Sequence, residues 1–292
     1  MRRKPPGKLL PSAHAVDREF RVLGALHRAG FPVPTPYLLC NDASVVGTPF
    51  HLTAFVDGRI FWEPSAPGLG EFDRRALFGA LNSTIARLHS IDFASIGLGD
   101  FGKGSDYVRR QIGRWSEQYR ASMTEAVPEM DSLIDWLPTA VPAQAEVALI
   151  HGDFRLDNCI VHVDRPEIAA VLDWELSTLG DPIADFTYHL MQWHMPPGGG
   201  GVGSLLGREA DRPGIPTMES YVEDYCAHRG LPGIPDLAIY LAYNFFRLAA
   251  IFQGIVGRLR DGSAANANAA MMVRQVRPMA ETAWRFAREA GA

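Results

Sequence analysis

One stretch of the sequence constrains the fold and the chemistry of this chain more than any other. Residues 149–158 read LIHGDFRLDN, in which a short apolar run leads into a polar turn that carries His151, Asp153 and Asn158. A second short apolar run, VLDWE, ends in another carboxylate, Asp173. Short apolar runs bounded by turn residues are typical of buried strands, and loops at strand ends are where a rigid scaffold holds catalytic groups. We therefore expect these four side chains to form one site.

The residue types in this pattern suit phosphoryl transfer from a nucleoside triphosphate. That reaction needs metal ions that neutralise the phosphates and a carboxylate that orients the attacking hydroxyl. Mg²⁺ prefers oxygen ligands and uses one or two carboxylates beside phosphate oxygens and water. We predict that Asp153 accepts the proton of a substrate hydroxyl and that Asn158 and Asp173 hold Mg²⁺. His151 is predicted to brace the loop by hydrogen bonds. An isolated HGD would fit an ordinary turn equally well, whereas the combined pattern is specific.

The hydrophobic pattern around these motifs predicts an α+β chain with a mostly helical second part. Helical spacing covers Val16–Ala29, Phe72–His89, Tyr107–Tyr119, Glu129–Leu137, Asp181–Trp193, Met218–Arg229, Pro235–Arg260 and Ala265–Glu289. Strand-like runs cover Tyr37–Cys40, Thr48–Val56, 147–151, Ile160–His162 and Ala169–Leu172. Residues 196–217, rich in proline and glycine, are expected to form a flexible surface loop. The order predicts a small lobe over 1–57 and a larger lobe over 58–292.

Composition excludes several classes of protein. The chain has 292 residues, of which 47% are hydrophobic, so a sizeable core is expected. A net charge of −5 argues against a nucleic-acid binder. Without a run of about 18 apolar residues or an apolar segment of signal-peptide type, we expect no membrane span and no secretion. The three cysteines, Cys40, Cys159 and Cys226, are far apart, so we expect free thiols in a soluble cytoplasmic protein.

The central motifs resemble a known family. HGDFRLDN, followed by VLDWE and then LGDPIADF, resembles the aminoglycoside phosphotransferase family, which has a protein-kinase-like bilobal fold. The blocks RKPPGKLLPSAHAVDREF, LDWELSTLGDP and FFRLAAIFQGI are similar to one subgroup, the phosphotransferase-like domain associated with acyl-CoA dehydrogenases. The resemblance covers nearly the whole chain. It implies ATP or GTP and Mg²⁺ as cofactors and the hydroxyl of a small molecule as acceptor.

The resemblance also implies roles for further residues. Glu19 matches the glutamate that pairs with a phosphate-binding basic residue, for which Arg2 is the best match and Arg3 or Lys4 the alternatives. Arginine at that position would clamp phosphate more rigidly than lysine. Arg155 is expected either beside the transferred phosphate or in a contact that ties the loop to a neighbour. The hinge, whose backbone groups would bind adenine, corresponds to Thr53, Ala54, Phe55 and Val56.

The chain departs from the family pattern at its N-terminus. The resembled fold begins with two strands and a glycine-rich loop, and Met1 of this chain already falls in the third strand. The resemblance therefore implies a truncated N-terminal lobe. Two explanations stay open: a misassigned start or shortened gene, or a genuine remnant with weak or no ATP binding.

The acceptor is indicated only by composition. The helical region over 188–260 mixes aromatic and basic side chains with few acids, which suits an anionic or partly apolar acceptor better than a polycation. The subgroup resemblance points to a hydroxyacyl-CoA type of acceptor. Two alternatives stay open, a non-catalytic pseudokinase module and an aminoglycoside kinase, and the sequence carries no signal for the oligomeric state. The candidate acceptor residues are Tyr188, Trp193, Tyr243, Arg247 and Arg258.

Overall fold

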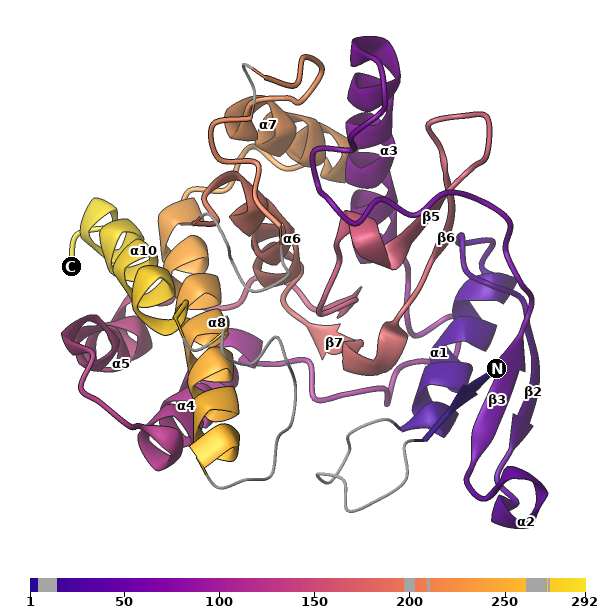
Figure 1. The fold of residues 1–292 in the computed structure, drawn as a ribbon, viewed down its shortest axis with the longest axis horizontal. Coiled ribbons are helices and arrows are strands. Elements are labelled where there is room, and N and C mark those ends of the chain that lie inside the picture. Colours follow the sequence, from indigo (N-terminus) through magenta and orange to yellow (C-terminus); the bar gives the residue numbers. More distant parts are fainter. Residues whose placement is uncertain (5–14, 197–202, 209–210, 261–271, 273) are drawn as a thin grey trace.

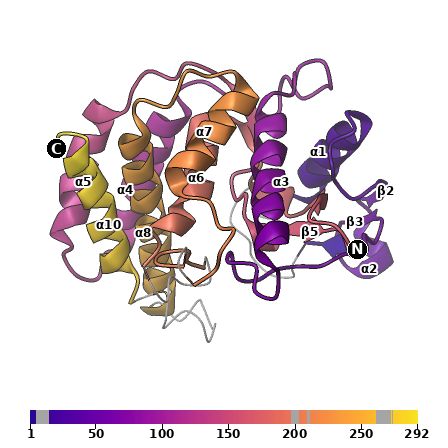
Figure 2. The same ribbon diagram turned by 90° about the horizontal axis from the view of Figure 1, so that it is seen from above.

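The computed structural model describes residues 1–4, 15–196, 203–208, 211–260, 272 and 274–292. A small antiparallel sheet with one helix lies at one end of the molecule and a group of helices at the other (Figure 1). The view turned by 90° shows the same separation, with α3 between the two ends (Figure 2). This arrangement agrees with the predicted α+β fold of two unequal lobes.

The N-terminal sheet has the strand order β1-β3-β2. Arg2 lies opposite His51 in this antiparallel register. Helix α1 buries the apolar side of its predicted spacing, including Val22 and Leu26. The strand predicted over Thr48–Val56 is shorter than expected, because only its middle part, Phe50–Thr53, pairs with neighbouring strands. These elements are β1 (Arg2–Arg3), α1 (Val16–Arg28), β2 (Pro36–Cys40), the short α2 (Ala43–Val46) and β3 (Phe50–Thr53).

After β3 the chain crosses to the second lobe as an extended linker. The linker is attached by a bridge in which the Arg59 and Val161 backbones exchange hydrogen bonds of 2.7 and 2.9 Å. Gly58 permits this approach, because a Cβ atom there would lie 2.5 Å from the Val161 carbonyl oxygen. The linker is therefore held against the strands that carry the predicted metal ligands.

A long buried helix organises the C-terminal lobe. α8 packs against α10, α4, α6 and α5, and α7 packs against α3. Within the predicted helix over Ala265–Glu289, α10 covers Val276–Glu289, and 265–271 and 273 lie outside the described residues. The helices are α3 (Glu71–His89), α4 (Tyr107–Ser122), α5 (Pro128–Ala140), α6 (Pro182–Leu190), α7 (Met218–Arg229), α8 (Leu237–Arg260) and α10 (Val276–Glu289).

One helix of the described residues is long and apolar enough to cross a membrane by length and composition. The segment Leu237–Arg258 of α8 has a mean hydropathy of 1.4, and 78% of its tested window is buried inside the fold. A helix that is apolar on most sides is also what the centre of a helical lobe requires. The burial assigns α8 to the core in this structure.

The central motifs lie at the ends of two short antiparallel sheets of two strands each. β4 (Ala148–Ile150) pairs with β7 (Thr178–Gly180), a strand that the sequence pattern did not predict. β5 (Cys159–Val161) pairs with β6 (Ile168–Val171), as predicted. Within the described parts of the loop predicted over 196–217, Leu205 and Ile215 are buried and Leu206 is exposed.

Candidate active site

His151 connects the two sheets. It follows β4 and is fully buried. Its Nδ1 atom accepts a hydrogen bond from the Asp153 backbone N–H at 3.2 Å, and its Nε2 atom donates to the Leu172 carbonyl at 2.8 Å. This pattern assigns the neutral imidazole with the proton on Nε2. His151 therefore braces the loop against the strand that leads to Asp173.

Asp185 of α6 holds the backbone of the same loop. Its carboxylate accepts hydrogen bonds from the N–H groups of His151 and Gly152, both at 2.8 Å. His89 lies 3.1 Å from the same carboxylate. Burial alone would raise the pKa of Asp185, but the hydrogen bond and charge of His89 and the loop N–H groups outweigh burial and lower that pKa. A buried, charged Asp185 therefore fixes the loop in place.

Asp153 projects from this loop and is surrounded by donors. Its Oδ1 atom accepts the Tyr188 hydroxyl at 2.8 Å, and its Oδ2 atom accepts the Asn158 amide at 3.1 Å. Arg155 forms an ion pair with Oδ1 at 3.3 Å and a second one with Asp157 at 2.9 Å. The Asp153 side chain remains 21% exposed. Its carboxylate is thus held in one orientation and still reachable from outside.

Asn158 and Asp173 lie at the same end of the β5–β6 pair. Asn158 ends the 3₁₀ turn η1 (Leu156–Asn158), and its carbonyl accepts from the Leu172 N–H at 2.8 Å. Asp173 has a left-handed backbone with φ of 62° and precedes the turn η2 (Trp174–Leu176). The Asn158 amide nitrogen is hydrogen-bonded to Asp153, so the Asn158 side-chain oxygen is the atom that can contact a metal ion. One carboxylate and one amide oxygen fit the donor preference of Mg²⁺.

Arg2 joins three carboxylates. Its guanidinium lies 2.9 Å from Glu19, 2.7 Å from Asp173 and 2.7 Å from Glu175. Burial acts to lower the pKa of Arg2, but these three carboxylates outweigh it and raise that pKa. The structure therefore forms the Arg2–Glu19 pair that the resemblance implies. Glu175 was missed by sequence reasoning, although its position two residues after Asp173 in VLDWE was a usable signal.

Two adjoining cavities form a cleft beside this cluster. The first, of about 410 Å³, contains the predicted hinge segment, and the second, of about 190 Å³, contains the Arg2 cluster. They share Met1, Pro34, Thr53 and Leu172. The Ala54 N–H already bonds to the Thr35 carbonyl at 2.8 Å, so this N–H is occupied within the chain. The first cavity is lined by Met1, Pro34, Thr53, Ala54, Phe55, Val56, Gly58, Ile60, Ile160 and Leu172.

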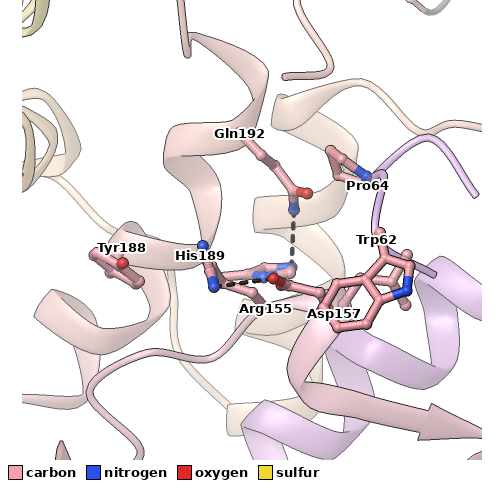
Figure 3. A pocket seen from close by; sticks show the side chains of 8 residues that line it. Trp62, Pro64, Arg155, Asp157, Tyr188, His189 and Gln192 are labelled. Carbon is pink, nitrogen blue, oxygen red and sulfur yellow. Dashed lines mark hydrogen bonds and ion pairs between the residues drawn. The ribbon is translucent and has the colours of Figure 1, made fainter. Parts of the chain in front are cut away.

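A separate pocket lies between the linker and α6 and includes Tyr188, the donor to Asp153 Oδ1. Trp62 and Pro64 of the linker face α6 residues, and Arg155 and Asp157 lie between them (Figure 3). Trp62 is 76% exposed at this pocket. Burial raises the pKa of Asp157, and the charge of Arg155 opposes that rise. Trp62 and Gln192 were not predicted from the sequence, because only the fold brings the linker to α6. The pocket is lined by Trp62, Pro64, Arg155, Leu156, Asp157, Tyr188, His189 and Gln192.

Of the five predicted acceptor residues, only Tyr188 lines this pocket. Trp193 and Tyr243 are buried core residues, so their predicted contact with an acceptor is wrong in this structure. Trp193 donates from its indole to the Pro216 carbonyl at 3.0 Å. Arg247 is 9% exposed and donates to the Gly152 carbonyl at 3.2 Å, behind the catalytic loop. Arg258 is exposed and lies about three turns further along α8.

The chain is similar to known proteins over most of its length. The model of the phosphotransferase enzyme family matches residues 1–238. Acyl-CoA dehydrogenase family member 10 of Mus musculus is 46% identical over 291 residues, covering 100% of this chain and 27% of that protein. Acyl-CoA dehydrogenase family member 11 of Homo sapiens is 40% identical over 284 residues, covering 97% of this chain and 36% of that protein. The chain thus spans about a third of the length of these relatives.

Solved structures show the same fold. A Ralstonia eutropha protein described as a "putative aminoglycoside phosphotransferase" superposes with a TM-score of 0.89 and 45% identity, over 94% of this chain and 84% of that one. The GDP complex of aminoglycoside 2'-phosphotransferase-IIIa superposes with a TM-score of 0.60 and 14% identity, over 90% of this chain and 81% of that one. The second likeness concerns the fold alone.

Proposed function

This chain belongs to the phosphotransferase enzyme family, and on that premise we propose that it transfers the γ-phosphoryl group of ATP or GTP to a hydroxyl of a small molecule. The observation that carries the proposal is the position of Asp153. Its carboxylate accepts hydrogen bonds from Asn158, a predicted metal ligand, and from Tyr188, which lines the Trp62 pocket. A carboxylate held between a metal ligand and a pocket residue is suited to orient an acceptor hydroxyl for in-line transfer.

Different residues at the cleft would contact different parts of the nucleotide. Arg2, kept in place by Glu19, supports the phosphates, and Asn158 with Asp173 would hold Mg²⁺. The metal, when bound, neutralises the charge of the phosphate oxygens. The acceptor oxygen bonds to the γ-phosphorus, the bond from that phosphorus to the β-phosphate bridging oxygen breaks, and the hydroxyl proton passes to Asp153. The hinge segment Thr53–Val56 lines the cavity in which the purine ring of the nucleotide would lie.

The acceptor we favour is a hydroxyacyl-CoA. Trp62 is the exposed apolar side chain of this pocket and would contact an acyl chain, whereas Pro64 and Leu156 are buried beside it. A polycationic aminoglycoside would need several carboxylates. Within the described part of the chain this pocket has one carboxylate, Asp157, and it is paired with Arg155. The names of the relatives, acyl-CoA dehydrogenase family members 10 and 11, support an acyl thioester.

A panel of acceptors tests this proposal. The purified chain is incubated with ATP or GTP and Mg²⁺, and with hydroxyacyl-CoAs of different chain length and hydroxyl position, the matching acyl-CoAs without a hydroxyl, or aminoglycosides. Release of nucleoside diphosphate and mass spectrometry of the acceptor are measured. We expect phosphorylated hydroxyacyl-CoA and no product from the matched acyl-CoAs. Turnover with aminoglycosides alone would overturn the acceptor class while leaving the phosphotransferase proposal intact.

A further inference from the structure

Tyr188 contacts the proposed base directly. It projects from α6, and its phenol donates to Asp153 Oδ1 at 2.8 Å. Burial raises the pKa of Tyr188 and the charge of Asp153 raises that pKa further, so the phenol keeps its proton and remains a donor. The two oxygens of Asp153 thus have different partners: Tyr188 on Oδ1 and Asn158 on Oδ2. Together with the Arg155 ion pair to Oδ1 at 3.3 Å, these two bonds hold the carboxylate in one rotation.

Arg247 supports Tyr188 from the interior. Its guanidinium carbon lies 5.2 Å from the centre of the Tyr188 ring, which is a cation–π contact. Its Nη2 atom donates to the Gly152 carbonyl at 3.2 Å, one residue before Asp153. A buried guanidinium costs desolvation energy, so a fold retains it where its contacts are needed. Arg247 therefore links the tyrosine to the backbone of the catalytic loop.

We propose that Tyr188 is a positioning residue that holds Asp153 in its catalytic orientation, with Arg247 bracing the tyrosine, a role that rests on the proposed function. This assigns both residues to the base rather than to acceptor binding. Arg247 does not line the acceptor pocket, and although Tyr188 does, its hydroxyl is bonded to Asp153. Rates of transfer depend on reacting groups held close to their productive geometry. Loss of the phenol should therefore slow turnover more than it weakens binding of the acceptor.

Tyr188→Phe tests the proposal, and Tyr240→Phe is the matched control. The Tyr240 hydroxyl is also buried and donates at 3.1 Å to the carboxylate of Asp181, which caps the N-terminal end of α6 and lines neither the cleft nor the Trp62 pocket. We expect Tyr188→Phe to lower kcat about tenfold or more while the KM of the acceptor stays within about twofold. Tyr240→Phe should leave both constants within about twofold. In an Asp153→Asn background, Tyr188→Phe should cause no further loss.

Three results would overturn the proposal: a wild-type kcat in Tyr188→Phe, a rise in acceptor KM alone, or an equal loss with and without Asp153. Crystal structures of both variants give a readout that needs no activity. Asp153 should leave its position in Tyr188→Phe and keep it in Tyr240→Phe, and an unmoved Asp153 in Tyr188→Phe would also refute the inference. If the wild type transfers no phosphoryl group, the proposed function fails, and these structures still decide the positioning contact.

Discussion

His189, which contacts the catalytic loop, makes the free energy of unfolding of the protein depend on pH. The ring is buried on α6, its Nδ1 atom donates to the Phe154 carbonyl at 3.2 Å, and its Nε2 atom accepts the Tyr221 hydroxyl at 2.9 Å. Both contacts suit the neutral imidazole. Burial lowers the pKa of His189 to about 4, from an ordinary value of 6.5. The unfolded chain therefore binds a proton on this ring at a higher pH than the native protein does.

The sign and size of this pH dependence follow from the difference in proton binding between the folded and the unfolded chain. Because the native pKa is depressed, the contribution of His189 to stability is complete above pH 6.5 and is lost as the pH falls towards 4. The two pKa values give a loss of about 2 kcal/mol between pH 7.5 and pH 5, and about 3 kcal/mol below the native pKa. A loss of that size is a large part of the stability of an ordinary domain.

Urea unfolding at pH 7.5 and pH 5 measures this contribution. His189→Gln keeps a donor for Phe154 and an acceptor for Tyr221 but cannot be protonated in this range. We expect the wild type to lose about 2 kcal/mol more than His189→Gln between the two pH values. The exposed His27→Gln controls for removal of a histidine elsewhere and should behave as the wild type. Equal losses in wild type and His189→Gln would refute the reasoning.

Three further predictions concern the loop and the cleft. Asp185→Ala leaves two buried loop N–H groups without their acceptor, so thermal unfolding should show a loss of about 3–5 kcal/mol and transfer should fall sharply. Gly152→Ala places a Cβ 2.8 Å from the Leu176 carbonyl oxygen at a φ of +84°, so calorimetry should show at least about 1 kcal/mol of destabilisation. Arg2→Lys cannot reach three carboxylates at once, and nucleotide titration should show about fivefold weaker binding; unchanged affinity would contradict the role of the guanidinium fork.

The proposed base and metal ligands could be predicted from the sequence because they lie close together along the chain. Asp153 and Asn158 are five residues apart on one loop, so their proximity needs only a turn. Asp173 ends a strand whose pairing partner immediately follows Asn158. The strand β7 was missed because three residues between two turns carry too little hydrophobic pattern to separate it from a loop.

The residues that line the acceptor pocket could not be predicted in the same way. Aromatic residues at helical spacing look alike in a core and in a pocket, and Trp193 and Tyr243 proved to be core. Trp62 reaches α6 only because the linker is attached to β5 by the Arg59–Val161 bridge, a contact between residues about a hundred positions apart. Such long-range contacts depend on the whole fold and leave no local periodicity.

The most direct test of the proposed phosphotransferase is the rate of transfer in Asp153→Asn. Asparagine keeps the shape of the side chain but cannot accept the acceptor's proton, so kcat should fall about 100-fold or more. Because the Asp153 side chain is partly exposed and distinct from the Arg2 cluster, the melting temperature and the affinity for nucleotide should stay near wild type. Near wild-type turnover in this variant would contradict the assignment of Asp153 as the base.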